Sequence, residues 1–183
     1  MKGNIFSVRS FGGALFVLRV LEVDIYRVAF IGHREIDDII YVEDAVQEIA
    51  KGLLRTYEYV DFYVGRNGDF DISVASAIKR AQKSNDNSNS SLIVVLPYTV
   101  KDEYFLEQFY DEIYYPLDHK THFKEAITKR NRWMIDNADL LICYVEEGRY
   151  GGAMTTLKYA QNSRIRIINL AEKGDENGYR RFL

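Results

Sequence analysis

The sequence has one cysteine, two prolines and no excess of positive charge. Cys143 cannot form an internal disulfide, and it lies in the apolar run 140–145, where we expect a small buried side chain. The 24 basic and 27 acidic residues give a formal net charge of -3, so no overall positive field attracts a nucleic-acid backbone. Binding of nucleic acid is therefore disfavoured. A lone thiol suits a reducing compartment, and we expect a cytoplasmic protein.

Long hydrophobic runs are also missing. A helix that spans a membrane needs roughly 18 or more apolar residues, whereas the first 25 residues hold only the run 11–18, which Arg19 ends. No small-residue cleavage site follows, so we predict neither a membrane span nor a secretory signal. Residues 1–25 are interpreted as an N-terminal extension, either an extra edge strand, an oligomer contact or an addition outside the core fold. Residues 26–183 are predicted to form a single domain.

Several motifs of cofactor and catalytic chemistry are absent as well. The sequence has no GxxxxGK[ST] loop and no GxGxxG after the first predicted strand, which argues against an ordinary NTPase or a dinucleotide dehydrogenase. Cysteine and histidine do not cluster as zinc ligands, and there is no GxSxG nucleophile. No metal site and no required cofactor are predicted.

From Tyr26 onward, short apolar runs alternate with segments of helical period, which is typical of a parallel sheet with crossover helices. We predict an α/β fold, a Rossmann-like three-layer sandwich with a mostly parallel sheet of about five or more strands. The predicted strands are 27–31, 60–64, 92–96, 138–145 and 165–170, and the predicted helices cover 42–53, 74–81, 123–134 and the segment after 152.

Two segments break this alternation. The polar stretch 84–91 is predicted to be a surface loop. The segment 98–120 is dense in aromatic residues without a regular period, and its rings are expected to be buried in the core or at a subunit contact. The second alternative predicts a homo-oligomer, a dimer in the simplest case.

Glycine-bearing polar turns follow three of the predicted strands, where the ligand crevice of an open parallel sheet lies. Glycine lets the backbone approach a ligand, and the amides of a helix's first turn bind anions. The turn at Gly151 and Gly152 offers both, although two glycines can also serve a tight turn alone. The predicted ligand-binding residues are Gly32, His33, Arg34, Gly65, Arg66, Asn67, Gly68, Asp71, Arg130, Gly151, Gly152, Thr155 and Thr156.

The roles of three of these side chains need a closer interpretation. His33 is a proton donor, a ring stacked on a base or a solvated turn residue. Arg34 at a strand end matches phosphate oxygens in bidentate fashion. Arg130 shares a helix face with Ile127 and Met134, which directs it toward the sheet, unless it is a surface arginine.

Four blocks of the sequence, in this order, resemble the SLOG superfamily: 30–34, 62–71, 130–139 and 151–156. That group joins the DNA-processing protein DprA, the Lonely Guy (LOG) nucleotide phosphoribohydrolases and the YpsA-like proteins, and this sequence is most similar to small bacterial YpsA-like members. The resemblance covers about residues 26–170 and implies a Rossmann-like fold with a nucleotide-type pocket. It departs from the LOG motif PGGxGTxxE, because Tyr150, Met154 and Lys158 replace the proline, the third glycine and the glutamate.

The first functional hypothesis is therefore binding or sensing of a nucleotide-derived, phosphate-bearing small molecule. The alternative is a nucleotide N-glycosidase with a non-standard carboxylate, Asp71, Glu146 or Glu147, because such cleavage needs a carboxylate. A lesser alternative is binding of single-stranded DNA of the DprA type through the aromatic segment, although that segment is acidic where a basic track is needed.

Overall fold

The computed structural model describes residues 7–11, 14–18, 23–85, 88–118 and 121–172. The rest of the predicted N-terminal extension and the last residues of the predicted domain, 173–183, lie outside the described residues. Six parallel strands form one sheet in the order β6-β5-β4-β3-β7-β8, which confirms the predicted Rossmann-like sheet. The strands are β3 (Ile25–Gly32), β4 (Tyr59–Val64), β5 (Ser90–Val95), β6 (Glu112–Tyr114), β7 (Leu140–Tyr144) and β8 (Arg166–Asn169).

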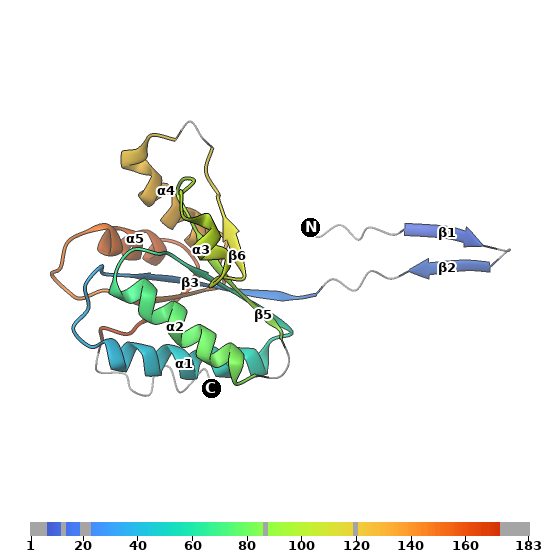
Figure 1. Cartoon of the computed structure of the whole chain (residues 1–183), viewed down its shortest axis with the longest axis horizontal. Helices are drawn as coiled ribbons and strands as arrows, with labels where there is room; N and C mark the ends of the chain where they lie inside the picture. The colour runs from blue at the N-terminus through green and yellow to red at the C-terminus, as the bar shows by residue number, and fades with distance from the viewer. Residues whose placement is uncertain (1–6, 12–13, 19–22, 86–87, 119–120, 173–183) are drawn as a thin grey trace.

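Helices cover both faces of this sheet. Figure 1 shows α1 (Ile39–Thr56) and α2 (Asp69–Lys83) against one face, and α4 (Phe123–Asp136) and α5 (Gly152–Gln161) against the other. Successive residues of a strand point to opposite faces. Val28 and Phe30 accordingly join the core under α1 and α2, while Ala29 and Ile31 join the core under α4 and α5. Each central strand is buried on both sides, which explains its continuous apolar run.

The order of the strands places a crevice between β3 and β7. The chain begins the sheet at β3, adds β4, β5 and β6 on one side, and then returns to add β7 and β8 on the other side of β3. The helices that follow β3 and β7, α1 and α5, therefore lie on opposite faces (Figure 1). Such a switch point leaves an opening outside the carboxyl ends of the two strands, where ligands of open α/β sheets bind.

The aromatic segment contains two short elements, α3 (Glu103–Glu107) and the edge strand β6. Pairing of β6 with β5 extends over three residues, too few to give a sequence period. Tyr104 and Phe105 are 68% and 72% exposed, so the expectation that the rings of this segment lie in the core is wrong for these two. Their role at a subunit contact stays a prediction.

In the N-terminal extension, β1 (Ser7–Phe11) and β2 (Ala14–Leu18) pair with each other as a separate antiparallel sheet. They are not edge strands of the six-stranded sheet, which corrects one of the alternatives for this segment. Among the described residues, no helix combines the length and the apolar character that a membrane span requires. Cys143 is a free, buried thiol in β7, as predicted, and burial raises its pKa to about 12.

Candidate functional site

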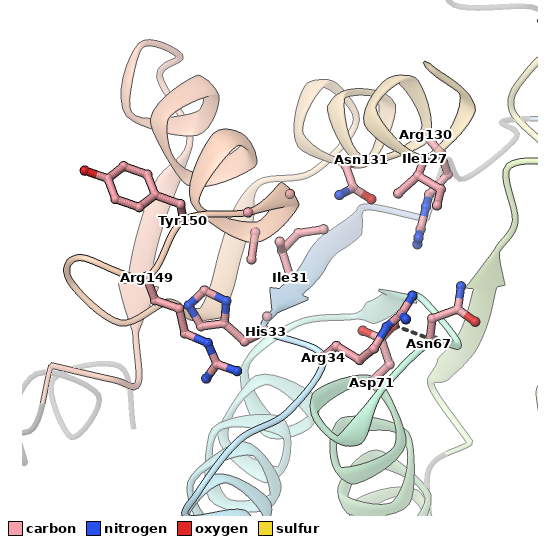
Figure 2. Close-up of a pocket in the computed structure, with 14 residues that line it drawn as sticks. Ile31, His33, Arg34, Asn67, Asp71, Ile127, Arg130, Asn131, Arg149 and Tyr150 are labelled. Carbon is pink, nitrogen blue, oxygen red and sulfur yellow. Dashed lines mark hydrogen bonds between the residues drawn. The ribbon is translucent and has the colours of Figure 1, made fainter. Parts of the chain in front are cut away.

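A cavity of about 330 Å³ lies at the carboxyl ends of β3, β4 and β7. The turns that follow these three neighbouring strands converge on it, and Figure 2 shows side chains from α4 reaching it from the opposite side. Its lining residues are Ile31, Gly32, His33, Arg34, Asn67, Asp71, Ile127, Arg130, Asn131, Arg149, Tyr150, Gly151, Gly152 and Ala153. The structure thus brings together eight of the thirteen predicted ligand-binding residues.

The turn between β7 and α5 leaves the start of the helix open. The N-cap residue Gly151 makes no side-chain capping bond, and a Cβ on Gly151 or Gly152 would meet nothing within 4 Å. Amides in the first turn of a helix have no intrahelical partner and carry a partial positive charge. Gly152 and Ala153, which line the cavity, belong to this turn. The end of α5 is therefore suited to an anion.

Positive charge dominates the lining. Three arginines, Arg34, Arg130 and Arg149, contribute to it, against a single carboxylate, Asp71. Arg149 pairs with Glu146 at 2.8 Å, while Arg34 is exposed. A cleft lined by one sign of charge raises the local concentration of ligands of the opposite sign. The pocket therefore favours an anionic ligand, although the protein as a whole is slightly acidic.

Arg130 from α4 and Asp71 from α2 lie near each other in the pocket lining, beside Gly65. Arg130 is 5% exposed, its Nη1 donates to Met134 Sδ at 3.6 Å, and its Nε has no hydrogen-bond partner in the described structure. Asp71 accepts a hydrogen bond of 2.9 Å from the backbone N–H of Asn67. A Cβ at Gly65 would collide with the Asp71 carboxylate and lie 2.9 Å from Arg130 Nη1. Gly65 therefore makes room for this pair instead of lining the pocket.

Burial shifts both pKa values in the directions that disfavour charge. It raises the pKa of Asp71 to about 6, against the opposing effects of the Arg130 charge and the Asn67 hydrogen bond. It also lowers the pKa of Arg130, while the Asp71 carboxylate opposes that change. The pocket lining therefore holds a carboxyl group whose pKa is raised to about 6 beside a cation that is still charged.

His33 ties the ends of β3 and β7 together. Its side chain is buried, its backbone N–H donates to the Tyr144 carbonyl at 3.2 Å, and its Nε2 accepts a hydrogen bond of 3.2 Å from the Glu146 N–H. An accepting Nε2 means a neutral ring with its proton on Nδ1. Burial, assisted by the Arg149 charge, lowers the pKa of His33. The interpretation of His33 as a solvated turn residue is therefore wrong.

Two of the predicted glycines are required by packing. A Cβ on Gly32 would overlap the ring of Phe70 from α2. Gly68 has a φ of +113°, and its Cβ would lie 2.5 Å from the carbonyl oxygen of Arg34. Of the glycine turns expected to let the backbone approach a ligand, the turn at Gly151 and Gly152 has free space above it.

Several predicted residues lie outside the pocket lining. Arg66 forms a bidentate ion pair with Asp102, with distances of 2.9 and 2.8 Å. The hydroxyls of Thr155 and Thr156 donate to the carbonyls of Gly151 and Gly152 within the first turn of α5. These three side chains are therefore committed to partners in the protein. The candidate carboxylates Glu146 and Glu147 also lie outside the lining, which leaves Asp71 as the candidate carboxylate inside it.

Sequence reasoning did not assign Asn131, Arg149 and Tyr150 to the site. Asn131 follows Arg130 on the buried side of α4 and is 7% exposed. Its place as a polar residue on an otherwise apolar helix face is the sequence feature that could have indicated a role for Asn131 in the site. Arg149 and Tyr150 belong to the turn after β7, and Tyr150 is 89% exposed at the mouth. Among the described residues, no group of three or more His, Cys, Asp or Glu side chains could hold a metal ion.

The fold and the pocket define a Rossmann-like domain with an anion-favouring crevice at its switch point. No family model matches the sequence, and a search of the curated proteins finds no match. DprA from Streptococcus pneumoniae matches with a TM-score of 0.57 and 15% identity, over 78% of this chain and 49% of that chain. The chain thus spans about half the length of DprA, and at this identity the match shows the fold alone.

Two structures of the molybdenum cofactor carrier protein from Chlamydomonas reinhardtii also match. Their TM-scores are 0.45 and 0.47, with identities of 11% and 13%. The matches cover 79% and 81% of this chain, and 75% and 77% of the carrier protein chains.

Proposed function

We propose that this protein binds a nucleotide-derived, phosphate-bearing small molecule in the pocket at the carboxyl ends of β3, β4 and β7. The observation that carries the proposal is Arg130, a buried cation whose Nε has no hydrogen-bond partner in the described structure. It lines the same cavity as the N-terminus of α5. A guanidinium offers its donors in a planar fork that matches phosphate oxygens. The amides of α5 add fixed dipoles directed at the same anion.

The size and the place of the cavity support a nucleotide-sized ligand. A volume of about 330 Å³ lies at the lower end of the range of small-molecule sites. Switch-point crevices of parallel sheets bind nucleotides in many folds, and the four motif blocks resemble those of SLOG proteins. We therefore extend the proposal to membership of the SLOG superfamily, near its small bacterial YpsA-like members, and to a cytoplasmic protein.

Isothermal titration against nucleoside monophosphates, ADP-ribose and cyclic dinucleotides tests this function. We expect saturable binding that Arg130→Met or Gly152→Asp weakens at least about tenfold. Arg132→Met is the matched control, since Arg132 lies on the same helix but is exposed over the Tyr159 ring, and it should bind as the wild type does. No binding across the whole panel would overturn the proposal, as would an Arg130→Met protein that binds normally.

Cleavage of a nucleotide's N-glycosidic bond is a second candidate function, favoured by Asp71. A general acid or base works best with a pKa near the operating pH, and the pKa of Asp71 is raised to about 6 in the pocket lining. The LOG glutamate corresponds to Lys158, which is exposed on α5. Cleavage in this protein would therefore depend on Asp71.

Chromatographic detection of free base released from nucleoside monophosphates tests this second candidate. Release should be lost in Asp71→Asn, while Glu147→Gln, a carboxylate outside the lining, should retain it. If the purified protein binds nucleotides but releases no base from any of them, the protein is a binder and the second candidate is wrong.

A further inference from the structure

Two buried polar atoms of α4 lack hydrogen-bond partners in the described structure, Arg130 Nε and Asn131 Oδ1. Both residues line the pocket and are more than nine-tenths buried. Buried polar groups in folded proteins nearly always have a partner, so an unpaired one beside a cavity marks a place where a ligand or a water completes the bond. Arg130 Nε offers a donor, which the proposed phosphate satisfies. Asn131 Oδ1 requires something else.

A relay of two hydrogen bonds orients the Asn131 amide in this structure. The Thr156 hydroxyl donates to the Gly152 carbonyl at 2.8 Å, so its oxygen is left to accept. Asn131 Nδ2 donates to that oxygen at 3.1 Å. With the hydroxyl proton on the Gly152 carbonyl, turning the amide over would place its oxygen against the hydroxyl oxygen with no proton between them. The unpaired atom that Asn131 presents is therefore an acceptor.

This acceptor lies close to the proposed anion site. Only the two bonds of the relay separate the Asn131 amide from Gly152, the first residue of α5, and Figure 2 shows Asn131 directed from α4 toward the pocket. An amide oxygen repels the oxygens of a fully ionised phosphate. It attracts an O–H or N–H group of the ligand that lies within a few bonds of the phosphate.

In a nucleotide, the sugar hydroxyls meet this requirement, whereas the base is separated from the phosphate by the whole sugar ring. We infer that Asn131 recognises a free sugar hydroxyl, so that the ligand class is a phosphorylated sugar or a nucleotide with an unmodified ribose. This inference rests on the proposed phosphate site. It makes Asn131 a specificity-determining residue, with Thr156 as the residue that positions it.

A matched pair of ligands tests the inference: a nucleoside 5′-monophosphate that the protein binds, and its 2′,3′-dideoxy analogue. The two differ only in the ribose hydroxyls. The wild type should bind the ribonucleotide about tenfold more tightly, the value of one hydrogen bond. Asn131→Leu should bind both with the affinity of the dideoxy analogue. Thr156→Val should reduce the preference, and Thr156→Ser, which keeps the hydroxyl, should retain it.

The possible outcomes separate the two proposals. If no member of the nucleotide panel binds the wild type, the phosphate site itself is wrong. If both ligands of the pair bind equally, the phosphate site stands and the hydroxyl inference is overturned. If Asn131→Leu still prefers the ribonucleotide, the hydroxyl is recognised by another residue and the inference is overturned. If Asn131→Leu binds both ligands more weakly by the same factor, the donor to Asn131 comes from the base, which also overturns the inference. Thermal melting of each variant, monitored by circular dichroism, shows whether it is folded.

Discussion

Replacing Arg130 with methionine tests how the charges of Arg130 and Asp71 in the pocket lining balance each other. Methionine has a similar length, and it would pack beside Met134, which the guanidinium contacts in the wild type. The Arg130 charge lowers the pKa of Asp71, which burial nevertheless raises to about 6. Without that charge, the pKa of Asp71 should rise above 6, so that more of this carboxyl group is protonated at neutral pH.

Proton uptake limits how much stability the substitution removes through Asp71. One unit of pKa corresponds to about 1.4 kcal/mol. The wild-type pKa of about 6 lies roughly one unit below neutral pH, so protonating Asp71 at pH 7 costs about 1.4 kcal/mol. The variant cannot lose more folding free energy than this through Asp71, because protonation removes the unpaired charge. Below about pH 6 the carboxyl group is largely protonated in both proteins, and the cost approaches zero.

The sign of the pH dependence follows from the same values. In the unfolded chain Asp71 loses its proton near the ordinary aspartate pKa of 3.8, and in the fold it loses it near 6. Stability from this group is therefore greatest at low pH, falls as the pH rises between these values, and levels off above the folded pKa. In Arg130→Met the fall should continue above pH 6, by up to about 1.4 kcal/mol per pH unit.

Urea unfolding followed by circular dichroism between about pH 5.5 and 7.5 measures this difference. The reference is the double variant Arg130→Met with Asp71→Asn, which lacks both charges and keeps an acceptor for the Asn67 N–H. Arg132→Met controls for the loss of a helix arginine. The stability of the single variant should fall relative to the double variant as the pH rises. A constant difference over this range would refute the reasoning.

Three further predictions concern other parts of the site. Gly65→Ala should displace the Asp71 carboxylate, which the new methyl group would overlap, and weaken nucleotide binding at least about tenfold by calorimetry. His33→Ala should lower the free energy of unfolding by about 1–3 kcal/mol, because the Glu146 N–H loses its acceptor. In the wild type the pKa of His33 is lowered, so the stability that neutral His33 contributes to the fold is present above about pH 6.5 and is lost as the pH falls through the folded pKa. Arg66→Met should change stability by less than about 1 kcal/mol and leave nucleotide affinity unchanged, because Arg66 is paired outside the pocket lining.

Each of these has a clear contrary result. Normal affinity in Gly65→Ala would mean that the position of the carboxylate does not matter for the ligand. His33→Gln should retain more stability than His33→Ala, since its amide oxygen can still accept a hydrogen bond. Equal melting curves for the two variants would show that the hydrogen bond from the Glu146 N–H is not the cause of the lost stability. A large loss of nucleotide affinity in Arg66→Met would indicate that Arg66 belongs to the binding site.

The sheet could be predicted because its central strands are buried on both faces. All five residues of β7 are buried, which gives a continuous apolar run that needs no alternating pattern to be recognised. The edge strand β6 has no buried residue among its three, so neither length nor hydrophobicity marks it. The sequence does not place β1 and β2, because one short apolar run is compatible with an edge strand, an oligomer contact or an addition outside the core fold.

The position of the site could also be predicted, because strand ends and the glycines after them are visible in the sequence. The sequence could not show which of those glycines has free space above it, because this depends on residues far away in the chain. Phe70 packs where a Cβ of Gly32 would lie, and the Arg34 backbone does so at Gly68. The same holds for Arg66, whose partner Asp102 is 36 residues away. Charge pairs between distant segments leave no local pattern.

The proposal that α5 receives the anion is supported by what occupies the N-termini of α1 and α2, the helices that follow β3 and β4. α1 has its N-cap Asp38, whose side chain accepts from the Tyr41 N–H. α2 carries Asp69 and Asp71 in its first turn, so its partial positive charge already faces carboxylates of the protein. α5 has no acidic residue in its first turn and no side-chain cap. The N-termini of α1 and α2 thus face carboxylates of the protein, whereas the N-terminus of α5, at the cavity that the buried Arg130 also lines, has none in its first turn and suits the negative charge of the proposed ligand.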